Sequence, residues 1–137
     1  MADMGFTPEL QAGGDIYPFR FVKLSTAADF TGLQAAAEGD YPVGVTDGSI
    51  YQASPLNSSG KHAISGTPIT LQPSNTVQIE LGTGGATRGG FLESDVDGKA
   101  VAAAGVGAAS CYVALESGAA GEIIRAFRIG MRGPIFS

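Results

Sequence analysis

The fold is decided by GFLESDVDGKAV, residues 90–101, and by ALESGAAGEIIR, residues 114–125. Each stretch holds a short apolar run, a turn rich in Asp or Gly, and a second run, which is the pattern of antiparallel strands joined by tight turns. Upstream, Val77, Ile79 and Leu81 alternate with polar residues, which is typical of a half-buried strand. The sequence therefore predicts an all-β fold, a small antiparallel β-barrel or β-sandwich.

The remaining elements are weaker patterns. Residues 15–24 predict a strand that begins irregularly or lies at an edge, because Pro18 lacks a backbone donor. Residues 27–38 predict one or two helical turns, since Phe30, Leu33 and Ala37 have roughly helical spacing and Gly39 can end a helix. We expect this to be the only helix. Further strands are expected at residues 41–46 and 49–53 as a hairpin around Asp47-Gly48, at 67–71 and 76–81 on either side of a turn, and at 112–115 and 122–129 as a closing pair.

The chain length of 137 residues fits one domain. We expect an N-terminal arm at residues 1–14, a β-rich domain at residues 15–129 and a C-terminal tail at residues 130–137. Deletion of residues 1–12 or 131–137 is expected to leave the domain folded. The expected core consists of Phe19, Phe21, Val43, Val45, Val77, Ile79, Leu81, Tyr112, Val113, Leu115, Ile123 and Ile124.

The composition predicts a thin core. The chain has no Trp, and its 21 Gly residues each lose more backbone entropy on folding than other residues do. Large buried side chains are therefore few for the number of residues that must be ordered. We expect the domain to gain stability by forming an oligomer or by docking on a larger surface.

The formal charge is −5, which argues against a nucleic-acid partner, because such proteins present a basic surface. The charge is unevenly distributed along the chain. Arg125, Arg128 and Arg132 follow the last acidic residue, Glu122. These arginines either belong to a solvated last strand or form a basic edge that meets an acidic partner or a neighbouring copy.

Cys111 is the only cysteine, so the chain cannot form an internal disulfide, and we expect a buried structural thiol rather than a nucleophile. No segment approaches the roughly 18 apolar residues of a membrane span. The first residues, MADMG, lack the pattern of a signal peptide. We therefore expect a soluble protein that is made in a cytoplasm and has no membrane partner.

Three motifs resemble part of a functional site but lack the other residues that such a site needs. Asp95-Val96-Asp97-Gly98 resembles the start of a calcium loop, but no late Glu follows, which favours a simple turn. Residues 82–85, GTGG, lack the Lys and helix of a phosphate-binding loop. His62 stands in a polar stretch with no second His or paired Cys. We expect no catalytic residue, no metal and no cofactor.

Both ends of the chain are apolar where solvated termini are usually polar. Either the ends fray, or they dock on a neighbour, where burying one large side chain contributes about 1.5–3 kcal/mol. The residues expected to contact a partner or a sister subunit are Phe6, Leu10, Arg125, Arg128, Arg132, Ile135 and Phe136.

Three segments together resemble one known family. They are GDIYPFRFVKL at residues 14–24, YPVGVT at residues 41–46, and the turn at residues 95–100 with the ending at residues 114–125. In this order they are similar to the capsid cement, or head decoration, proteins of tailed bacteriophages. The resemblance spans most of residues 14–129, and each motif in it consists of glycines and turns.

The resemblance implies a structural virion protein without enzymatic activity. Such a protein is made in the host cytoplasm, binds the outer surface of the capsid and bridges major capsid proteins. It commonly assembles as a homotrimer and sometimes as a dimer. The alternative is a host-surface or carbohydrate-binding β module, although the absence of Trp speaks against an aromatic sugar platform. A third possibility, a small hydrolase, would have to use His62 or the pair Asp95 and Asp97.

Overall fold

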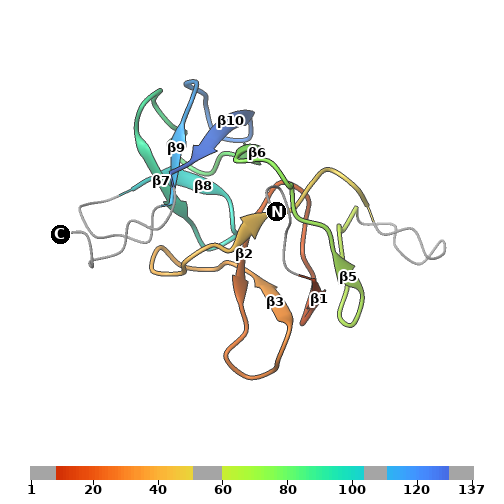
Figure 1. Ribbon diagram of the computed structural model, residues 1–137. Coiled ribbons are helices and arrows are strands. Elements are labelled where there is room, and N and C mark those ends of the chain that lie inside the picture. Colours follow the sequence, from red (N-terminus) through yellow and green to blue (C-terminus); the bar gives the residue numbers. More distant parts are fainter. Residues whose placement is uncertain (1–8, 51–59, 104–110, 130–137) are drawn as a thin grey trace, which may run out of the picture.

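The computed structural model describes residues 9–50, 60–103 and 111–129, which form ten strands in two five-stranded sheets (Figure 1). Sheet 1 has the order β4-β2-β3-β1-β5, and sheet 2 has the order β6-β10-β9-β7-β8. The strands are β1 (Leu10–Ala12), β2 (Phe21–Leu24), β3 (Thr31–Gln34), β4 (Gly44–Val45), β5 (Pro68–Ile69), β6 (Thr76–Glu80), β7 (Phe91–Ser94), β8 (Ala100–Ala102), β9 (Tyr112–Ala114) and β10 (Ile123–Arg128).

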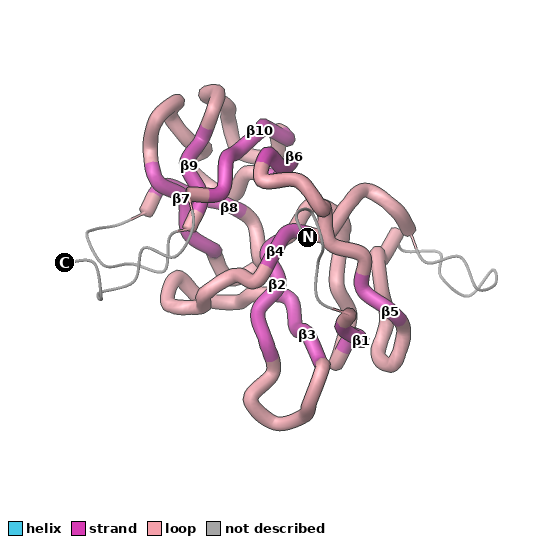
Figure 2. The backbone as a smooth tube through the Cα atoms, in the orientation of Figure 1, coloured by secondary structure: helices cyan, strands magenta, loops and turns pink. Residues whose placement is uncertain are grey.

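The all-β prediction is confirmed: the described part of the chain contains strands and loops and no helix (Figure 2). Neither does it contain a helix long and apolar enough to cross a membrane. Neighbouring strands run antiparallel throughout, except for β1 and β3, which are parallel.

The predicted helix at residues 27–38 is wrong, because most of this segment is loop and its centre is strand β3. Gly32 lies so close to its neighbours that an added Cβ would meet Ile69 at 2.8 Å and Val22 at 3.0 Å. Phe30 has a φ of 51°, which no right-handed helix allows, and its side chain is exposed. Tertiary packing of Gly32 against Val22 of β2 and Ile69 of β5 therefore outweighed the local helical spacing.

Sheet 1 curls until its two edges meet. Thr46, directly after β4, forms an antiparallel bridge with Leu71, two residues after β5. Around this bridge the Asp47 amide donates to the Thr70 carbonyl at 3.1 Å, and the Gln72 amide donates to the Val45 carbonyl at 2.9 Å. The expected hairpin at residues 41–53 is not present in the described residues, because β4 pairs with β2 instead. Residues 51–53 lie outside the described part.

Sheet 2 closes in the same way. Leu81, directly after β6, forms a parallel bridge with Ala100 of β8, and the Gly82 amide donates to the Ala100 carbonyl at 2.8 Å. The predicted β7–β8 hairpin and the predicted closing pair β9–β10 are both confirmed. The two strands expected around residues 72–75 belong to different sheets, so this turn carries the chain from sheet 1 into sheet 2.

Two hydrophobic cores result, and β2 lies between them. Phe21 packs in the core of sheet 2 with Tyr112, whose ring centroid is 5.4 Å away, whereas Val22 packs in the core of sheet 1. Alternating side chains of a strand point to opposite faces, so a strand buried on both faces has consecutive buried residues. This arrangement joins the two small barrels into one body.

Seven of the predicted core residues are buried: Phe21, Val45, Val77, Ile79, Leu81, Tyr112 and Ile124. The prediction is wrong for Leu115 and Ile123, which are exposed, and only partly right for the half-buried Phe19, Val43 and Val113. Ile123 precedes the inward-facing Ile124 on β10, so the pleat turns its side chain outward. Phe19 has a φ of 59°, and its ring lies against Gly48 beside the core.

The start of the chain also differs from the expectation. Residues 10–12, expected in a free arm, form β1, which lies between β3 and β5 in sheet 1. Leu10 is only 6% exposed and belongs to the core of this sheet. The expected tail at residues 130–137 lies outside the described residues.

Candidate functional site

His62, expected in a polar loop, is buried and holds two loops together. Its Nε2 accepts the Thr70 amide at 3.0 Å, and its Nδ1 donates to the Ser49 carbonyl at 2.9 Å. Asp47 Oδ1 lies 3.5 Å from Nδ1. Both ring nitrogens are thus engaged by the fold, which is the arrangement of a structural histidine. The buried setting was not visible in the sequence, because Ser, Gly and Lys surround His62.

Asp95 closes the turn between β7 and β8 as the sequence predicted. Its Oδ1 accepts the amides of Asp97 at 2.8 Å and Lys99 at 2.9 Å, and Gly98 has a φ of 76°. The carboxylate is therefore used by the backbone of its own turn. In the described ranges, no three His, Cys, Asp or Glu side chains lie close enough to hold a metal ion.

The glycine-rich residues 82–85 form a turn in the segment that connects β6 to β7. The Gly85 amide donates to the Gly82 carbonyl at 3.0 Å, and Gly84 and Gly85 have positive φ angles. Ala86 then pairs with Gly118 in an antiparallel bridge. Residues 82–85 thus connect strands.

Cys111 is buried in the core of sheet 2, where burial raises the pKa of its thiol. A nucleophilic cysteine needs the opposite change, because only the thiolate attacks. The structure therefore places this residue among the packing groups of the core, as the sequence indicated.

The two described C-terminal arginines have partners within the chain. Arg125 Nε lies 3.1 Å from Glu116 Oε2 on the solvent side of sheet 2. Arg128 Nη1 donates to the Val43 carbonyl at 3.2 Å, and its guanidinium lies 5.8 Å from the Tyr112 ring centroid. Arg128 thus joins the last strand of sheet 2 to the segment that precedes β4.

Of the other expected contact residues, Leu10 is only 6% exposed and packs mainly in the core of sheet 1. Phe6, Arg132, Ile135 and Phe136 lie outside the described residues. Apart from Arg125, the contact surfaces of the described part of the chain consist of exposed side chains that the sequence patterns did not indicate.

The outer face of sheet 2 carries an apolar row that sequence patterns missed. Phe91 of β7 is paired with Val113 of β9, which is paired in turn with Phe127 of β10. Directly opposed residues share a face, about 4.5–5.5 Å apart, so the three side chains are neighbours. Phe91 is 52% exposed and Phe127 is 40% exposed. We call these three residues the apolar row.

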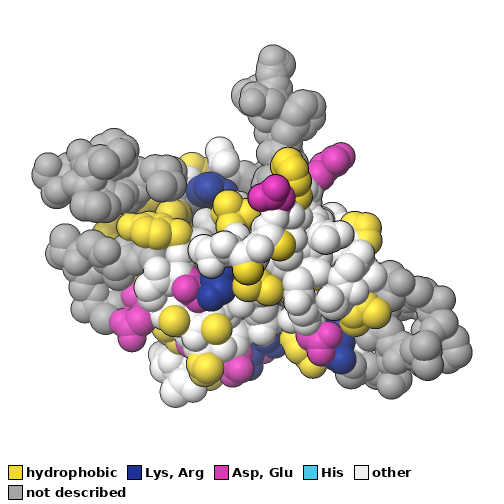
Figure 3. All heavy atoms as spheres, turned by 90° about the horizontal axis from the view of Figure 1, so that it is seen from below, with side chains coloured by type: hydrophobic (Ala, Val, Ile, Leu, Met, Phe, Trp, Pro, Cys, Tyr) yellow, Lys and Arg dark blue, Asp and Glu magenta, His cyan; other side chains and the backbone are white. Residues whose placement is uncertain are grey.

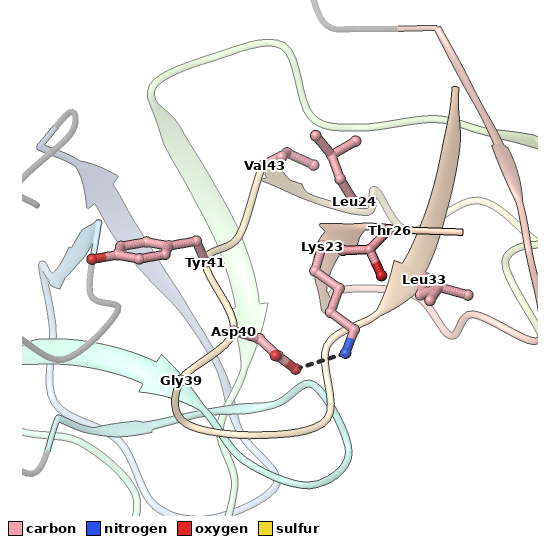
Figure 4. Close-up of a pocket in the computed structure, with 8 residues that line it drawn as sticks. All are labelled: Lys23, Leu24, Thr26, Leu33, Gly39, Asp40, Tyr41 and Val43. Atoms are coloured by element: carbon pink, nitrogen blue, oxygen red, sulfur yellow. Dashed lines mark ion pairs between the residues drawn. The ribbon is translucent and has the colours of Figure 1, made fainter. Parts of the chain in front are cut away.

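A pocket of about 370 Å³ lies beside β2, between Lys23 and the segment that leads to β4 (Figure 4). Lys23 Nζ forms an ion pair of 3.2 Å with Asp40 Oδ2 at its mouth. Leu24, Leu33 and Val43 supply apolar lining. Thr26 and Tyr41 complete the polar part of the lining, and the charges of Lys23 and Asp40 are already paired with each other.

A second recess, of about 730 Å³, lies at the β1–β5 side of sheet 1 and is lined by Leu10, Pro68 and the exposed Phe30. Glu9 and Asp29 stand at the same recess. Viewed from below, the surface shows hydrophobic side chains exposed at several separate places between polar ones (Figure 3). The geometry of the described chain thus provides contact surfaces: the apolar row and the Phe30 recess.

Comparison of the fold identifies a similar solved structure. The head fiber gp8.5 N base of bacteriophage phi29 superimposes with a TM-score of 0.57 over 88% of this chain and 90% of that one. The two proteins share a fold. Their sequences are 16% identical, so the likeness concerns the fold alone. No protein-family model matches the chain, and no curated protein matches it in sequence.

The sequence resembles a family of phage head proteins, and the solved structure that shares this fold is also a phage head protein. The match extends over nearly the whole of both chains, and so covers both barrels.

Proposed function

We propose that the protein is a structural component of a phage head, which binds the outer surface of the shell and bridges neighbouring major capsid proteins. One observation carries the proposal: the fold is shared, over nearly the full length of both chains, with the base of a phage head fiber. The local turn and strand motifs of head decoration proteins in residues 14–125 support it independently.

The chemistry of the described residues agrees with binding rather than catalysis. The side chains with the most reactive potential, His62, Asp95 and Cys111, are used by the backbone or by the core. By contrast, Phe91 and Phe127 of the apolar row are exposed to solvent. Apolar contacts repeated over many copies of a symmetric shell stabilise the shell by avidity.

Within this proposal, residues 1–8, which include Phe6, and the apolar row meet the head. The partners are the major capsid protein and other copies of the chain. The expected assembly of the copies is a homotrimer, with a dimer as the alternative. A clamp that spans two capsid proteins slows their separation because both contacts must open together.

The first experiment measures the abundance of the protein in purified virions by quantitative mass spectrometry against the major capsid protein. A ratio near one, or a simple fraction of it, is expected of a shell component. A trace amount or none would reject the proposal.

The second experiment measures binding to heads that lack the protein. Phe91→Thr together with Phe127→Thr is expected to weaken binding by about tenfold or more, since threonine keeps strand propensity and removes the rings. Val96→Thr, an exposed apolar residue at the β7–β8 turn, serves as the matched control. Equal affinity of the double variant and the control would exclude the apolar row from the contact.

The alternative function is a host-surface or carbohydrate-binding module. It predicts binding of the isolated protein to glycans on an array, together with absence of the protein from the shell. Exposed aromatic rings are the side chains that bind sugars in such modules, and Phe30, before β3, and Tyr41, before β4, are the rings to substitute in that case.

A further inference from the structure

Phe30 is the most exposed large hydrophobic residue of the described chain, at 77%. Its backbone is in the left-handed region, with a φ of 51°, which is unfavourable for a bulky side chain. A residue that is both strained and exposed contributes little to the stability of a single chain. Strained residues cluster at functional sites, where a protein binds a ligand or switches conformation.

The strained conformation is held in place from both sides. The Gln11 amide donates to the Phe30 carbonyl at 2.9 Å, the Ser25 amide donates to the Thr31 carbonyl at 2.8 Å, and Thr31 Oγ1 donates to the Asp29 carbonyl at 2.9 Å. These bonds connect the residues around Phe30 to β1 and to the end of β2. The ring is therefore presented to solvent by an ordered backbone.

The surroundings of Phe30 define the chemistry of a partner. The recess beside the ring has a volume of about 730 Å³, with Leu10 and Pro68 in its wall. Glu9 and Asp29 add two carboxylates, and neither forms an ion pair with another residue of the described chain. The recess thus fits an extended segment that is apolar and carries positive charge.

The chain itself contains such a segment. Residues 130–137 read GMRGPIFS, with Met131, Ile135 and Phe136 as apolar anchors and Arg132 as the cation. No acidic residue follows Glu122, so this end of the chain carries only positive side-chain charge. Its length of eight residues spans at most about 26–29 Å when extended.

The segment and the recess belong to different parts of the molecule. Residues 130–137 follow β10 of sheet 2, whereas the recess lies at β1 and β5 of sheet 1, away from β10 in Figure 1. A donor at one sheet and an acceptor at the other favour contact between copies, head to tail. Repeated around an axis, a head-to-tail contact closes into a ring.

We propose that the Phe30 recess receives residues 130–137 of a second copy of this chain, so that copies assemble head to tail. Ile135 or Phe136 packs against the Phe30 ring, and Arg132 pairs with Asp29 or Glu9. This contact is a property of the isolated protein and stands whether or not the protein binds a phage head.

The test measures the oligomeric state of the full chain by sedimentation equilibrium and native mass spectrometry. The natural chain is expected to form a closed oligomer. Phe30→Asn is expected to weaken association by about tenfold or more while the thermal midpoint of the dissociated chain stays equal or rises, because Asn tolerates a positive φ. Val96→Thr, the matched control, changes an exposed apolar residue at the β7–β8 turn and is expected to keep the oligomer.

A charge exchange then identifies the occupant. Asp29→Arg alone and Arg132→Asp alone are each expected to weaken association, and the double variant is expected to restore it. A natural chain that stays monomeric, an oligomer unchanged by Phe30→Asn, or two single charge variants whose effects simply add would each overturn the proposal. If the single variants lose the oligomer and the double variant does not restore it, the occupant of the recess is not residues 130–137, and the proposal is overturned as well.

Discussion

At the scale of single residues, the structure uses polar side chains to hold loops. His62 joins the Ser49 carbonyl to the Thr70 amide inside sheet 1, and Asp40 joins the Ala36 amide to the Lys23 ammonium. His62 links two loops, and Asp40 links the loop after β3 to strand β2. Their removal therefore affects the folded state more than their place in polar stretches of sequence indicates.

His62→Leu is expected to lower the free energy of unfolding by about 1–3 kcal/mol, because it leaves the Thr70 amide and the Ser49 carbonyl without the ring nitrogens that they bond. Urea denaturation followed by circular dichroism measures this loss. Lys61→Ala is the control at the neighbouring position. It removes the ion pair between Lys61 and Asp15 and should lower the free energy of unfolding by less than about 1 kcal/mol. Equal effects of the two variants would contradict a structural role for the imidazole.

Asp40 makes the stability of the fold depend on pH. Burial acts to raise the pKa of its carboxyl, but the Ala36 amide and the Lys23 ammonium outweigh it and hold the pKa below its usual value. A carboxyl whose pKa is lower in the folded chain stabilises the fold at neutral pH and loses that contribution as the pH falls below about 4.

Asp40→Asn is expected to destabilise the fold at pH 7 by about 1 kcal/mol and by less at pH 3, because the contribution of the ionised carboxyl declines as the pH falls below about 4. Thermal unfolding at the two pH values measures the difference. Glu38→Gln, whose exposed carboxylate forms no ion pair with another described residue, is the control and should behave alike at both. An Asp40→Asn effect that persists at pH 3 would mean that the ion pair is not its source.

At the scale of elements, β2 and β3 determine how sheet 1 packs. β2 is buried on both faces, with Phe21 in one core and Val22 in the other. β3 lies between β2 and β1, and its Gly32 allows Ile69 and Val22 to close over the strand. The absence of a side chain at this position is thus a packing requirement.

Gly32→Ala is expected to destabilise the fold by about 1–3 kcal/mol, because its methyl group would meet Ile69 and Val22 at 2.8 and 3.0 Å. Gly39→Ala is the matched control: an added Cβ there meets no atom within 4 Å, and the change should be neutral or slightly stabilising. Chemical denaturation of both variants provides the comparison. A neutral Gly32→Ala would mean that the sheet opens without strain at this point.

At the scale of the whole molecule, the two curled sheets depend on contacts between distant parts of the chain. β1 completes sheet 1 by pairing with β3 on one side and β5 on the other, and Leu10 and Ala12 fill its core. The N-terminal boundary of the folded unit therefore falls before residue 10, earlier than the sequence suggested. A truncated chain that keeps the fold must therefore retain β1.

Deletion of residues 1–12 is expected to unfold sheet 1, because it removes β1 from between its two neighbours. Deletion of residues 1–8 keeps β1 and is expected to leave the thermal midpoint within a few degrees of the natural value. Thermal denaturation distinguishes the two truncations directly. If both truncated chains melt like the natural one, β1 contributes nothing to the fold, contrary to its burial.

The sequence by itself determined what depends on neighbours along the chain: the all-β class, the Asp95–Gly98 turn, the β7–β8 hairpin and the closing pair of strands. Turn chemistry and side-chain alternation act over a few residues and can be read locally. Only the tertiary structure decided that residues 31–34 are a strand, that Leu10 and His62 are buried, and that Phe30 and the apolar row face solvent. Those outcomes depend on partners far away in the chain, because a β-sheet obtains its hydrogen bonds and packing from distant strands.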